Sequence, residues 1–348
     1  MAQSDGSGAG PTKAPTIKEV AARAGVGIKT VSRVLNNEPN VRPQTRERVM
    51  AAVGELGYRR NAIASSIRRL DQRTASIGLV VEDLINPFAS AITRVIQDFS
   101  AQRGHLVLVG SSDGEAARER ELVGEFCSRR VDGLIVVPSG PDQSYLEAER
   151  ERGTPVVFAD RPGRRIKADT VVSENAGGVA DAVRHLRQRG HTRIAYLGDR
   201  QSIYTAAQRL AGFRSAMSAG SDQGGDRRYI RTGLREREQA YDAALDVLGA
   251  DPAPTALICG NNLTAIGAIH AMQELGVRDR VAFIAFDDLE LAELLQPALT
   301  VVAQDSHAIG LEAARLLFER LDDPGAPNRR VTIPVRLIAR GSGEIPAP

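Results

Sequence analysis

The fold of the amino-terminal segment is decided by residues 16–36, TIKEVAARAGVGIKTVSRVLN. Thr16 and Glu19 have the spacing of a capping box, in which each side chain accepts a hydrogen bond from the other residue's backbone amide. They predict a helix that starts after Thr16 and ends at Gly25, because glycine readily adopts the left-handed conformation that terminates helices. A second helix is predicted over 28–36. The two short helices are joined by a tight turn that contains two glycines.

A third helix is predicted from Pro43 to Leu56, with apolar residues at helical spacing. Two short helices with a tight turn between them, closed by a third, form a helix-turn-helix domain. The second helix would expose side chains that suit the major groove of DNA: Ile28, Lys29, Thr30, Ser32, Arg33 and Asn36. Lys and Arg can donate to guanine, the hydroxyls and amide can hold phosphates, and Ile can contact a thymine methyl group. A three-helix bundle with a purely structural role is the alternative.

Charge is distributed unevenly along the 348 residues. Residues 1–73 carry 13 Lys and Arg against 6 Asp and Glu, a net charge of +7, whereas the remainder carries 32 against 37, a net charge of −5. A compact basic segment on an acidic body suggests a head that binds a polyanion and a body that binds something else. A solvated basic face is the alternative.

From Ser76 onward, apolar runs alternate with amphipathic stretches, which predicts an α/β body whose parallel strands are buried on both faces. Seven such runs are present: 77–81, 106–109, 133–137, 156–159, 194–197, 256–259 and 281–286. Several are followed by polar clusters: Glu82-Asp83, Ser111-Ser112-Asp113, Asp160-Arg161, Asn261-Asn262 and Asp287-Asp288. Because ligands bind at the carboxyl ends of parallel strands, these clusters predict one ligand zone, although any single Asp could instead cap a helix.

Length and composition exclude several classes of protein. A chain of 348 residues is longer than one hydrophobic core usually organises, so we expect two or more domains. The content of 42% hydrophobic and 25% charged residues excludes a wholly disordered or fibrous protein. No run of about 18 apolar residues is present to span a membrane, and residues 1–15 lack the features of a secretory signal. We therefore expect a cytoplasmic protein. Cys127 and Cys259 are expected to be small buried hydrophobes, and no metal or cofactor is expected.

After Pro15, the sequence resembles the LacI/GalR family of bacterial transcription regulators. In the head, the matching motifs are Ile17-Lys-Glu-Val-Ala-Ala-Arg-Ala-Gly-Val26, Thr30-Val-Ser-Arg-Val-Leu-Asn36 and Leu56-Gly-Tyr58. In the body, they are Asn86-Pro-Phe88, Val131-Asp-Gly-Leu-Ile135, Arg209-Leu-Ala-Gly-Phe213, Phe286-Asp-Asp288 and Leu299-Thr-Val-Val-Ala-Gln-Asp305. The resemblance implies a three-helix helix-turn-helix head followed by a core similar to periplasmic sugar-binding proteins.

That core is expected to consist of two doubly wound α/β subdomains joined by crossover strands. The implied divisions are a disordered tail over 1–15, the head over 16–59, a hinge helix and linker over 60–73, and the effector-binding core over 74–348. Within the core, the N-subdomain would take about 74–172 and 304–331, and the C-subdomain about 173–303 and 332–348.

The resemblance also implies DNA contacts in the head and hinge: Thr16, Ile28, Lys29, Thr30, Ser32, Arg33, Asn36, Thr45, Asn61, Ala64, Ile67 and Arg68. Paired hinge helices would enter the minor groove, where Ile67 stands in place of the family's usual leucine wedge. Arg60 replaces a frequent proline, and Gly27 replaces the usual Ser or Thr that caps the recognition helix. These departures affect fine specificity rather than DNA binding itself.

In the ligand cleft, the resemblance implies effector contacts at Asp160, Arg161, Arg209, Asn261, Asp287 and Gln304. The strand-end clusters add Ser111 and Asp113, and Phe88 and Tyr204 are expected to contribute aromatic rings. Asn262 stands where the family frequently has Asp. A carboxylate at this position can only accept hydrogen bonds, whereas the amide of Asn262 can also donate them. Paired acceptors and planar donors suit a polyhydroxylated sugar or a nucleobase, and we expect a sugar or sugar derivative more than a purine. Aromatic residues make up 4% of the chain and tryptophan is absent from the sequence, so Phe88, Phe158 and Tyr204 are the remaining candidates for stacking on a ligand.

The expected function is a ligand-responsive repressor of carbohydrate-related genes that binds palindromic double-stranded operator DNA as a homodimer. Effector binding would change the packing of the subdomains and thereby the folding of the hinge helices. One alternative is an enzyme that uses the cleft carboxylates as acid and base, but the sequence shows no recognisable nucleophile, metal site or phosphate loop. A solute-binding protein for transport is the other alternative, and the DNA-reading head argues against it.

Overall fold

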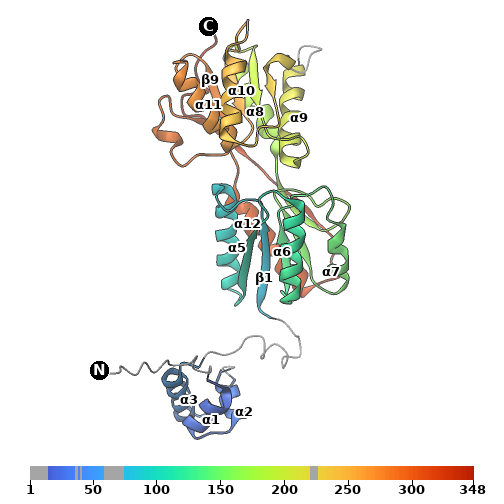
Figure 1. Cartoon of the computed structure of the whole chain (residues 1–348), viewed down its shortest axis with the longest axis vertical. Helices are drawn as coiled ribbons and strands as arrows, with labels where there is room; N and C mark the ends of the chain where they lie inside the picture. The colour runs from blue at the N-terminus through green and yellow to red at the C-terminus, as the bar shows by residue number, and fades with distance from the viewer. Residues whose placement is uncertain (1–14, 36–37, 40, 59–73, 220–225) are drawn as a thin grey trace, which may run out of the picture. The chain divides into compact units, whose positions relative to one another are not determined.

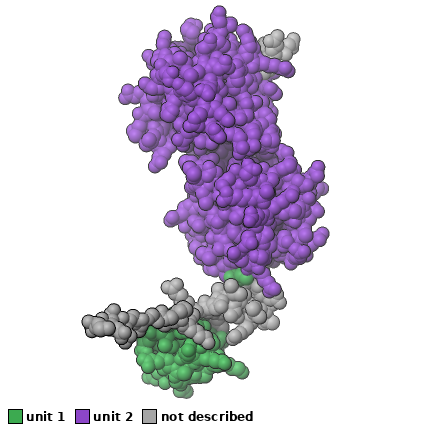
Figure 2. All heavy atoms as spheres, viewed as in Figure 1, with its two compact units in different colours: residues 1–74 green, residues 75–348 purple. Residues whose placement is uncertain are grey.

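The computed structural model describes residues 15–35, 38–39, 41–58, 74–219 and 226–348 (Figure 1). The chain divides into two compact units, residues 1–74 and 75–348 (Figure 2). Among the described residues, no helix has both the length and the apolar character needed to cross a membrane.

Among its described residues, the first unit contains three helices: α1 (Ile17–Ala24), α2 (Ile28–Leu35) and α3 (Pro43–Leu56). The predicted capping box is present at Thr16, and Gly25 ends α1 with a φ of 63°. The three helices bury a small core of short apolar side chains: Val20, Ala21, Ala24, Val31, Val34, Val49 and Ala52. The buried residues of α2 are Val31 and Val34, so its remaining residues are available to face outward.

The second unit consists of two lobes, each built on a six-stranded sheet. In the first lobe, the strands are β1 (Ser76–Val81), β2 (Leu106–Ser111), β3 (Gly133–Val136), β4 (Val156–Ala159), β5 (Asp169–Ser173) and β11 (Arg330–Ile333). Its helices are α5 (Pro87–Ala101), α6 (Ala116–Ser128), η1 (Ser144–Leu146), α7 (Glu147–Glu151) and α12 (Ser306–Asp322). The strand order is β11-β5-β4-β3-β1-β2.

The second lobe repeats this plan. Its strands are β6 (Ile194–Leu197), β7 (Ile230–Arg231), β8 (Ala256–Cys259), β9 (Ala282–Phe286), β10 (Thr300–Ala303) and β12 (Arg336–Ile338), in the order β12-β10-β9-β8-β6-β7. Its helices are α8 (Asn175–Arg187), α9 (Tyr204–Ser218), η2 (Arg227–Tyr229), α10 (Arg237–Leu248), α11 (Asn262–Glu274) and η3 (Ala292–Leu294). The chain passes between the lobes after β5, after β10 and after β11.

Both sheets are doubly wound, as the sequence predicted. Strand pairs are parallel except for β10 with β12. In the first lobe the strand order reverses between β1 and β3, and in the second between β6 and β8. A crevice opens at such a reversal, outside the carboxyl ends of the strands. Figure 2 shows a hollow between the two lobes of the second unit.

All seven predicted runs form strands, and the part of the chain that the structure describes contains five further strands that were not predicted from apolar runs. Three of these five lack the continuous apolar pattern. β7 has only two residues, and β11 and β12 have intermediate and exposed side chains because each lies at the edge of its sheet. β5 and β10 are well buried, but each contains polar residues within a short span.

Candidate functional site

The first unit presents the expected reading face on α2. Ile28, Lys29 and Arg33 are exposed, whereas Thr30 and Ser32 are half-buried. Arg33 Nε lies 3.2 Å from Glu38 Oε2, so this guanidinium is held near the carboxyl end of the helix. The carbonyl of Gly27 accepts from the amides of Thr30 and Val31. Because glycine has no side chain, this position supplies α2 with no side-chain cap.

Two other expected DNA contacts lie at helix starts. The Thr16 hydroxyl takes part in the capping box with Glu19, and Thr45 lies half-buried in the first turn of α3. The remaining expected contacts, Asn36, Asn61, Ala64, Ile67 and Arg68, lie outside the described residues.

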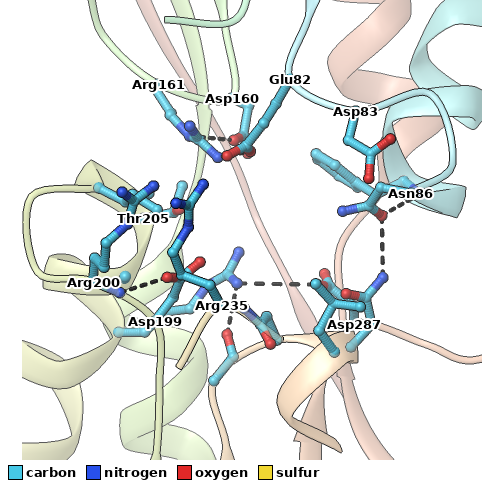
Figure 3. Close-up of a pocket in the computed structure, with 18 of the residues that line it drawn as sticks. Glu82, Asp83, Asn86, Asp160, Arg161, Asp199, Arg200, Thr205, Arg235 and Asp287 are labelled. Atoms are coloured by element: carbon cyan, nitrogen blue, oxygen red, sulfur yellow. Dashed lines mark hydrogen bonds and ion pairs between the residues drawn. The ribbon is translucent and has the colours of Figure 1, made fainter. Parts of the chain in front are cut away.

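In the second unit, a cavity of about 430 Å³ lies between the two lobes (Figure 3). Its lining residues follow the carboxyl ends of strands in both sheets, as the polar clusters predicted. They are Glu82, Asp83, Ile85, Asn86, Phe88, Asp113, Asp160 and Arg161 from the first lobe, Asp199, Arg200, Ile203, Thr205, Ala206, Arg209, Arg235, Gly260, Asn261, Asn262, Leu263 and Asp287 from the second, and Gln304 from the crossover. A cavity of this size is typical of small-molecule sites.

Arg161 organises the wall formed by the first lobe. Its guanidinium donates to a carboxylate oxygen of Glu82 and to the carbonyl of Pro138, and its Nε lies 3.2 Å from Asp160 Oδ2. Arg161 and Asp160 are buried, with 8% and 6% of their surfaces exposed. Asp160 Oδ1 has no hydrogen-bond partner in the described protein, so it remains an acceptor at the edge of the cavity.

Burial raises the pKa of the Asp160 carboxyl above its ordinary value, and the charges of Arg161 and Arg209 only partly oppose this effect. Burial likewise raises the pKa of the Asp199 carboxyl on the opposite wall (Figure 3). Desolvation disfavours the charged form of a carboxyl group. The cavity therefore holds acidic groups that gain from a ligand able to donate hydrogen bonds.

Arg209, in α9, organises the wall formed by the second lobe. It donates to Asn175 Oδ1 and to the carbonyl of Gly260, both at 2.7 Å, and its guanidinium carbon lies 3.7 Å from the centre of the Phe286 ring. Asp287 Oδ2 lies 4.0 Å from Arg209 Nη1. Stacking and two neutral acceptors fix the guanidinium plane, and Asp287 lies at the outer limit of an ion pair with it.

Gln304 connects the crossover to both lobes. Its amide donates to Asp287 Oδ1 at 2.6 Å, and its carbonyl accepts from the Ser173 hydroxyl at 2.5 Å. On the other side of the cavity, Asn262 Nδ2 donates to Asn86 Oδ1 at 3.1 Å, which joins α11 of the second lobe to the start of α5 in the first. The amide of Asn262 makes this contact possible, because a carboxylate at this position could only accept.

Eight of the ten expected effector residues line the cavity: Phe88, Asp113, Asp160, Arg161, Arg209, Asn261, Asp287 and Gln304. Ser111 and Tyr204 do not. Ser111 is still part of β2, and its hydroxyl donates to Glu82 O and Asp113 Oδ1. The Tyr204 hydroxyl accepts from Arg330 in β11 at 2.5 Å, so the start of α9 turns this ring toward the strand and Thr205 toward the cavity.

Several lining residues were not among the expected effector contacts. Glu82, Asp83 and Asn262 belong to the strand-end clusters already recognised in the sequence, and Asp199 and Arg200 could have been found by the same rule after the run 194–197. Arg235 has no such signal, because the strand before it, β7, contains only two residues.

Comparisons with known proteins agree with this architecture. Residues 16–61 match the model of bacterial regulatory proteins of the lacI family, and residues 183–343 match a periplasmic binding protein-like domain. The HTH-type transcriptional repressor PurR of Vibrio parahaemolyticus is 31% identical over 94% of this chain and 98% of its own length.

Two solved structures are also similar. The lac repressor dimer bound to operator and the anti-inducer ONPF is 27% identical, with a TM-score of 0.84 over 95% of this chain and 99% of that one. The transcriptional regulator CelR in complex with cellobiose is 30% identical, with a TM-score of 0.70 over 94% of this chain and 100% of that one. The chain therefore belongs to the lacI family of bacterial regulatory proteins, and it is a DNA-binding transcriptional regulator rather than an enzyme.

Proposed function

We propose that the protein is a repressor of carbohydrate-related genes that binds palindromic operator DNA as a homodimer and responds to a sugar or sugar derivative in the interlobe cavity. The lining of that cavity carries the proposal. Carboxylates, guanidinium groups and amides surround a space of about 430 Å³, and Phe88 is the one aromatic ring among the lining residues. Paired acceptors and planar donors suit adjacent hydroxyl groups.

The position of the cavity supports control by linkage. Its lining comes from both lobes and from the Gln304 crossover, so a ligand that contacts both walls stabilises one arrangement of the lobes over another. In our proposal, that arrangement sets the spacing of two hinge segments within the dimer, and thereby whether they fold on the minor groove. The residues expected to form the hinge helix, 61–69, lie outside the described part of the chain.

Relatives support two ligand classes. The similar CelR structure is a complex with cellobiose, which favours a sugar, whereas the similarity to a repressor named PurR makes a purine the second candidate. A purine offers a flat ring for stacking, but Phe88 alone would have to supply the aromatic surface among the described lining residues. The polar walls therefore favour the sugar.

The test is calorimetry of the full chain with cellobiose, ribose, glucose, adenine and hypoxanthine. We expect a sugar to bind, and Arg209→Gln to weaken that binding at least about tenfold, because it removes charged donors from one wall. Arg214→Gln is the matched control, since this exposed arginine lies in the same helix but outside the cavity.

The ligand found by calorimetry is then added to the full chain bound to a duplex selected from a random pool. A change in DNA affinity that Arg209→Gln reduces and Arg214→Gln preserves supports the proposal. Binding of purines alone, or a ligand whose affinity is equal in both variants, would reject the sugar assignment.

A further inference from the structure

Four arginines line the cavity, and two of them, Arg200 and Arg235, have guanidinium groups without a hydrogen-bond acceptor among the described residues. Among the described residues, neither guanidinium donates a hydrogen bond to a protein acceptor, and Arg200 Nε is buried without a partner. The nearest acidic atom to Arg235 is Glu115 Oε1 at 3.9 Å, between side chains that are 44% and 65% exposed. By contrast, Arg161 and Arg209 each have two acceptors.

Each of the cavity carboxylates has at least one protein partner, although Asp160 Oδ1 has none. Glu82 accepts from Arg161, Asp113 from Arg118 and Ser111, and Asp287 from Gln304. Asp83 and Asp199 accept from the backbone amides of Ile85 and Arg200, and Asp160 is ion-paired with Arg161. Every lining acid therefore has a protein partner, whereas two permanently charged guanidinium groups with five N–H donors each have no acceptor. The lining as a whole carries six carboxyl groups against four guanidinium groups. At the end of the cavity that Arg200 and Arg235 line, however, the described protein supplies no acceptor for their donors, so this end can take an anionic group.

The start of α9 adds donors to the same end of the cavity. Ile203 is the N-cap residue and cannot accept a hydrogen bond through its side chain, and the first amide of this 15-residue helix with a backbone acceptor is that of Ala207. Ile203, Thr205 and Ala206 all line the cavity. Free amides at the positive end of a helix dipole form a favourable site for an anion.

An independent observation points to a ligand in this cavity. Arg161 Nε has no hydrogen-bond partner although the side chain is 10% exposed, and it lies on the wall opposite Arg200 (Figure 3). Asp160 Oδ1 beside it is likewise unpartnered. Buried donors and acceptors that lack a protein partner in a cleft are available to bind a ligand.

The cavity also has room for a substituent. Its volume of about 430 Å³ lies within the range of roughly 300–1,000 Å³ that is typical of sites for drug-sized ligands. A hexose, with 12 non-hydrogen atoms, is smaller than such ligands. A hexose therefore fits with space left over for a further group.

We propose that the effector is an anionic sugar derivative, a polyhydroxylated body with a carboxylate or a phosphate ester that Arg200, Arg235 and the first turn of α9 bind. This inference rests on the sugar site proposed above and assigns one end of it. Planar guanidinium groups bind carboxylate and phosphate oxygens alike, so the two sources share the same recognition chemistry.

The first experiment uses inorganic phosphate as the probe and the thermal unfolding of the full chain as the readout. At tenfold excess over its Kd, phosphate should raise the Tm by roughly 2 °C relative to sodium chloride at the same ionic strength. Arg200→Gln and Arg235→Gln should abolish this shift, and Arg214→Gln should retain it. If phosphate instead binds at the basic head, all three variants will keep the rise in Tm, and that result would overturn the proposal.

The second experiment compares glucose, glucuronate and glucose 6-phosphate by calorimetry. We expect at least one anionic member to bind about tenfold or more tighter than glucose, with that advantage lost in Arg200→Gln and Arg235→Gln. The preferred anion distinguishes a carboxylate from a phosphate. A neutral sugar that binds as tightly as its anionic forms overturns this inference and leaves the proposed function intact, whereas purine binding that depends on Arg209 rejects the sugar assignment itself.

Discussion

At the scale of single residues, the cavity depends on aspartates held in an unusual backbone conformation. Asp113, Asp160 and Asp287 have φ values of 52°, 64° and 76°, in the left-handed region that most residues avoid. Each follows directly, or within two residues, the end of a strand. Such strain is retained where surrounding structure enforces it, and here it accompanies side chains that line the cavity. Aspartate tolerates this region better than bulky or branched residues do.

Asp160 should make the protein less stable as the pH rises. Its pKa in the folded protein is raised by burial above the ordinary value of 3.8, so folding takes up a proton between these two pH values. The unfolded chain binds fewer protons in that window, and the contribution of Asp160 to the free energy of unfolding falls as pH rises through it. Asp160→Asn removes the ionisation, and we expect a higher Tm than the wild type at neutral pH together with weaker sugar binding.

The measurement is thermal unfolding of both proteins from pH 4 to pH 8 without ligand. The difference in Tm between Asp160→Asn and the wild type should grow with pH. Asp98→Asn is the control, because this side chain is 59% exposed on α5. A Tm difference that does not change with pH would mean that Asp160 stays ionised throughout.

Arg33 is expected to read bases, and its replacement tests that assignment. Arg33→Ala should cost about 1–3 kcal/mol of binding free energy for the selected operator while changing affinity for random duplexes much less. Arg23→Ala removes the same charge from α1, where Arg23 pairs with Glu55 at 2.6 Å. Competition binding on both duplexes measures the ratio of affinities. If the two variants lose equal selectivity, Arg33 contributes charge only.

At the scale of helices and strands, the motif Arg209-Leu-Ala-Gly-Phe213 has a packing explanation as well as a ligand role. Arg209 binds within the cavity wall, and one turn later Gly212 allows α9 to approach α8. A Cβ atom added at Gly212 would lie 2.2 Å from the carbonyl oxygen of Ala176. Because the obstacle is backbone, it cannot rotate away. The close approach of these helices places Arg209 next to its acceptor on Asn175 at the start of α8.

Gly212→Ala should therefore lower the free energy of unfolding by about 1–3 kcal/mol, through overpacking between two helices. Gly124→Ala is the matched control, since Gly124 lies within α6 and a Cβ atom there would have no neighbour within 4 Å. That control should gain up to about 1 kcal/mol from the better helix propensity of alanine. Urea unfolding of the full chain measures both. Equal stability of the two variants would show that α8 and α9 separate at little cost.

Sequence patterns predicted the elements whose local signal is strong. The first head helix, α1, begins and ends where the capping box at Thr16 and the glycine at Gly25 indicated, because these signals act within one helical turn. Buried parallel strands were also recognised, since continuous apolar runs leave few alternatives. β11 and β12 were missed because an edge strand is half exposed and lacks that run.

Residues of the cavity could be predicted only as far as the strand ends. Asp160 and Asp287 follow buried strands, so their position at the crevice follows from topology. The direction of a side chain at the start of a helix depends on packing, which explains why Tyr204 faces Arg330 and not the cavity. Arg235 follows a strand of two residues, and only the folded loop brings it to the ligand.

At the scale of the whole molecule, the division of charge determines how DNA affinity depends on salt. Residues 1–73 carry a net charge of +7 and the remaining residues −5, so the long-range attraction to the phosphate backbone of DNA comes from the head. Affinity for any duplex should fall by about 10³ or more between 50 and 200 mM salt, as counterion release requires. Affinity for the sugar should change far less. Anisotropy titrations at four salt concentrations measure the slope, and a flat response would rule out phosphate neutralisation by the head.

Thermodynamic linkage between the cavity and the head predicts a reciprocal effect of ligand and operator on each other's affinity. If the ligand changes operator affinity by some factor, operator must change ligand affinity by the same factor, because both describe one thermodynamic cycle.

The Asn262–Asn86 contact between the lobes offers a way to alter that factor without removing a charge from the cavity. Asn262→Asp places an acceptor against an acceptor, so the lobes lose this contact and the populations of their arrangements change. We expect the two reciprocal factors to shift together, by about 5-fold or more, when both are measured by calorimetry with and without operator. Asp98→Asn should leave both factors unchanged, and unequal factors in any of these proteins would show that ligand and operator do not act through a single equilibrium.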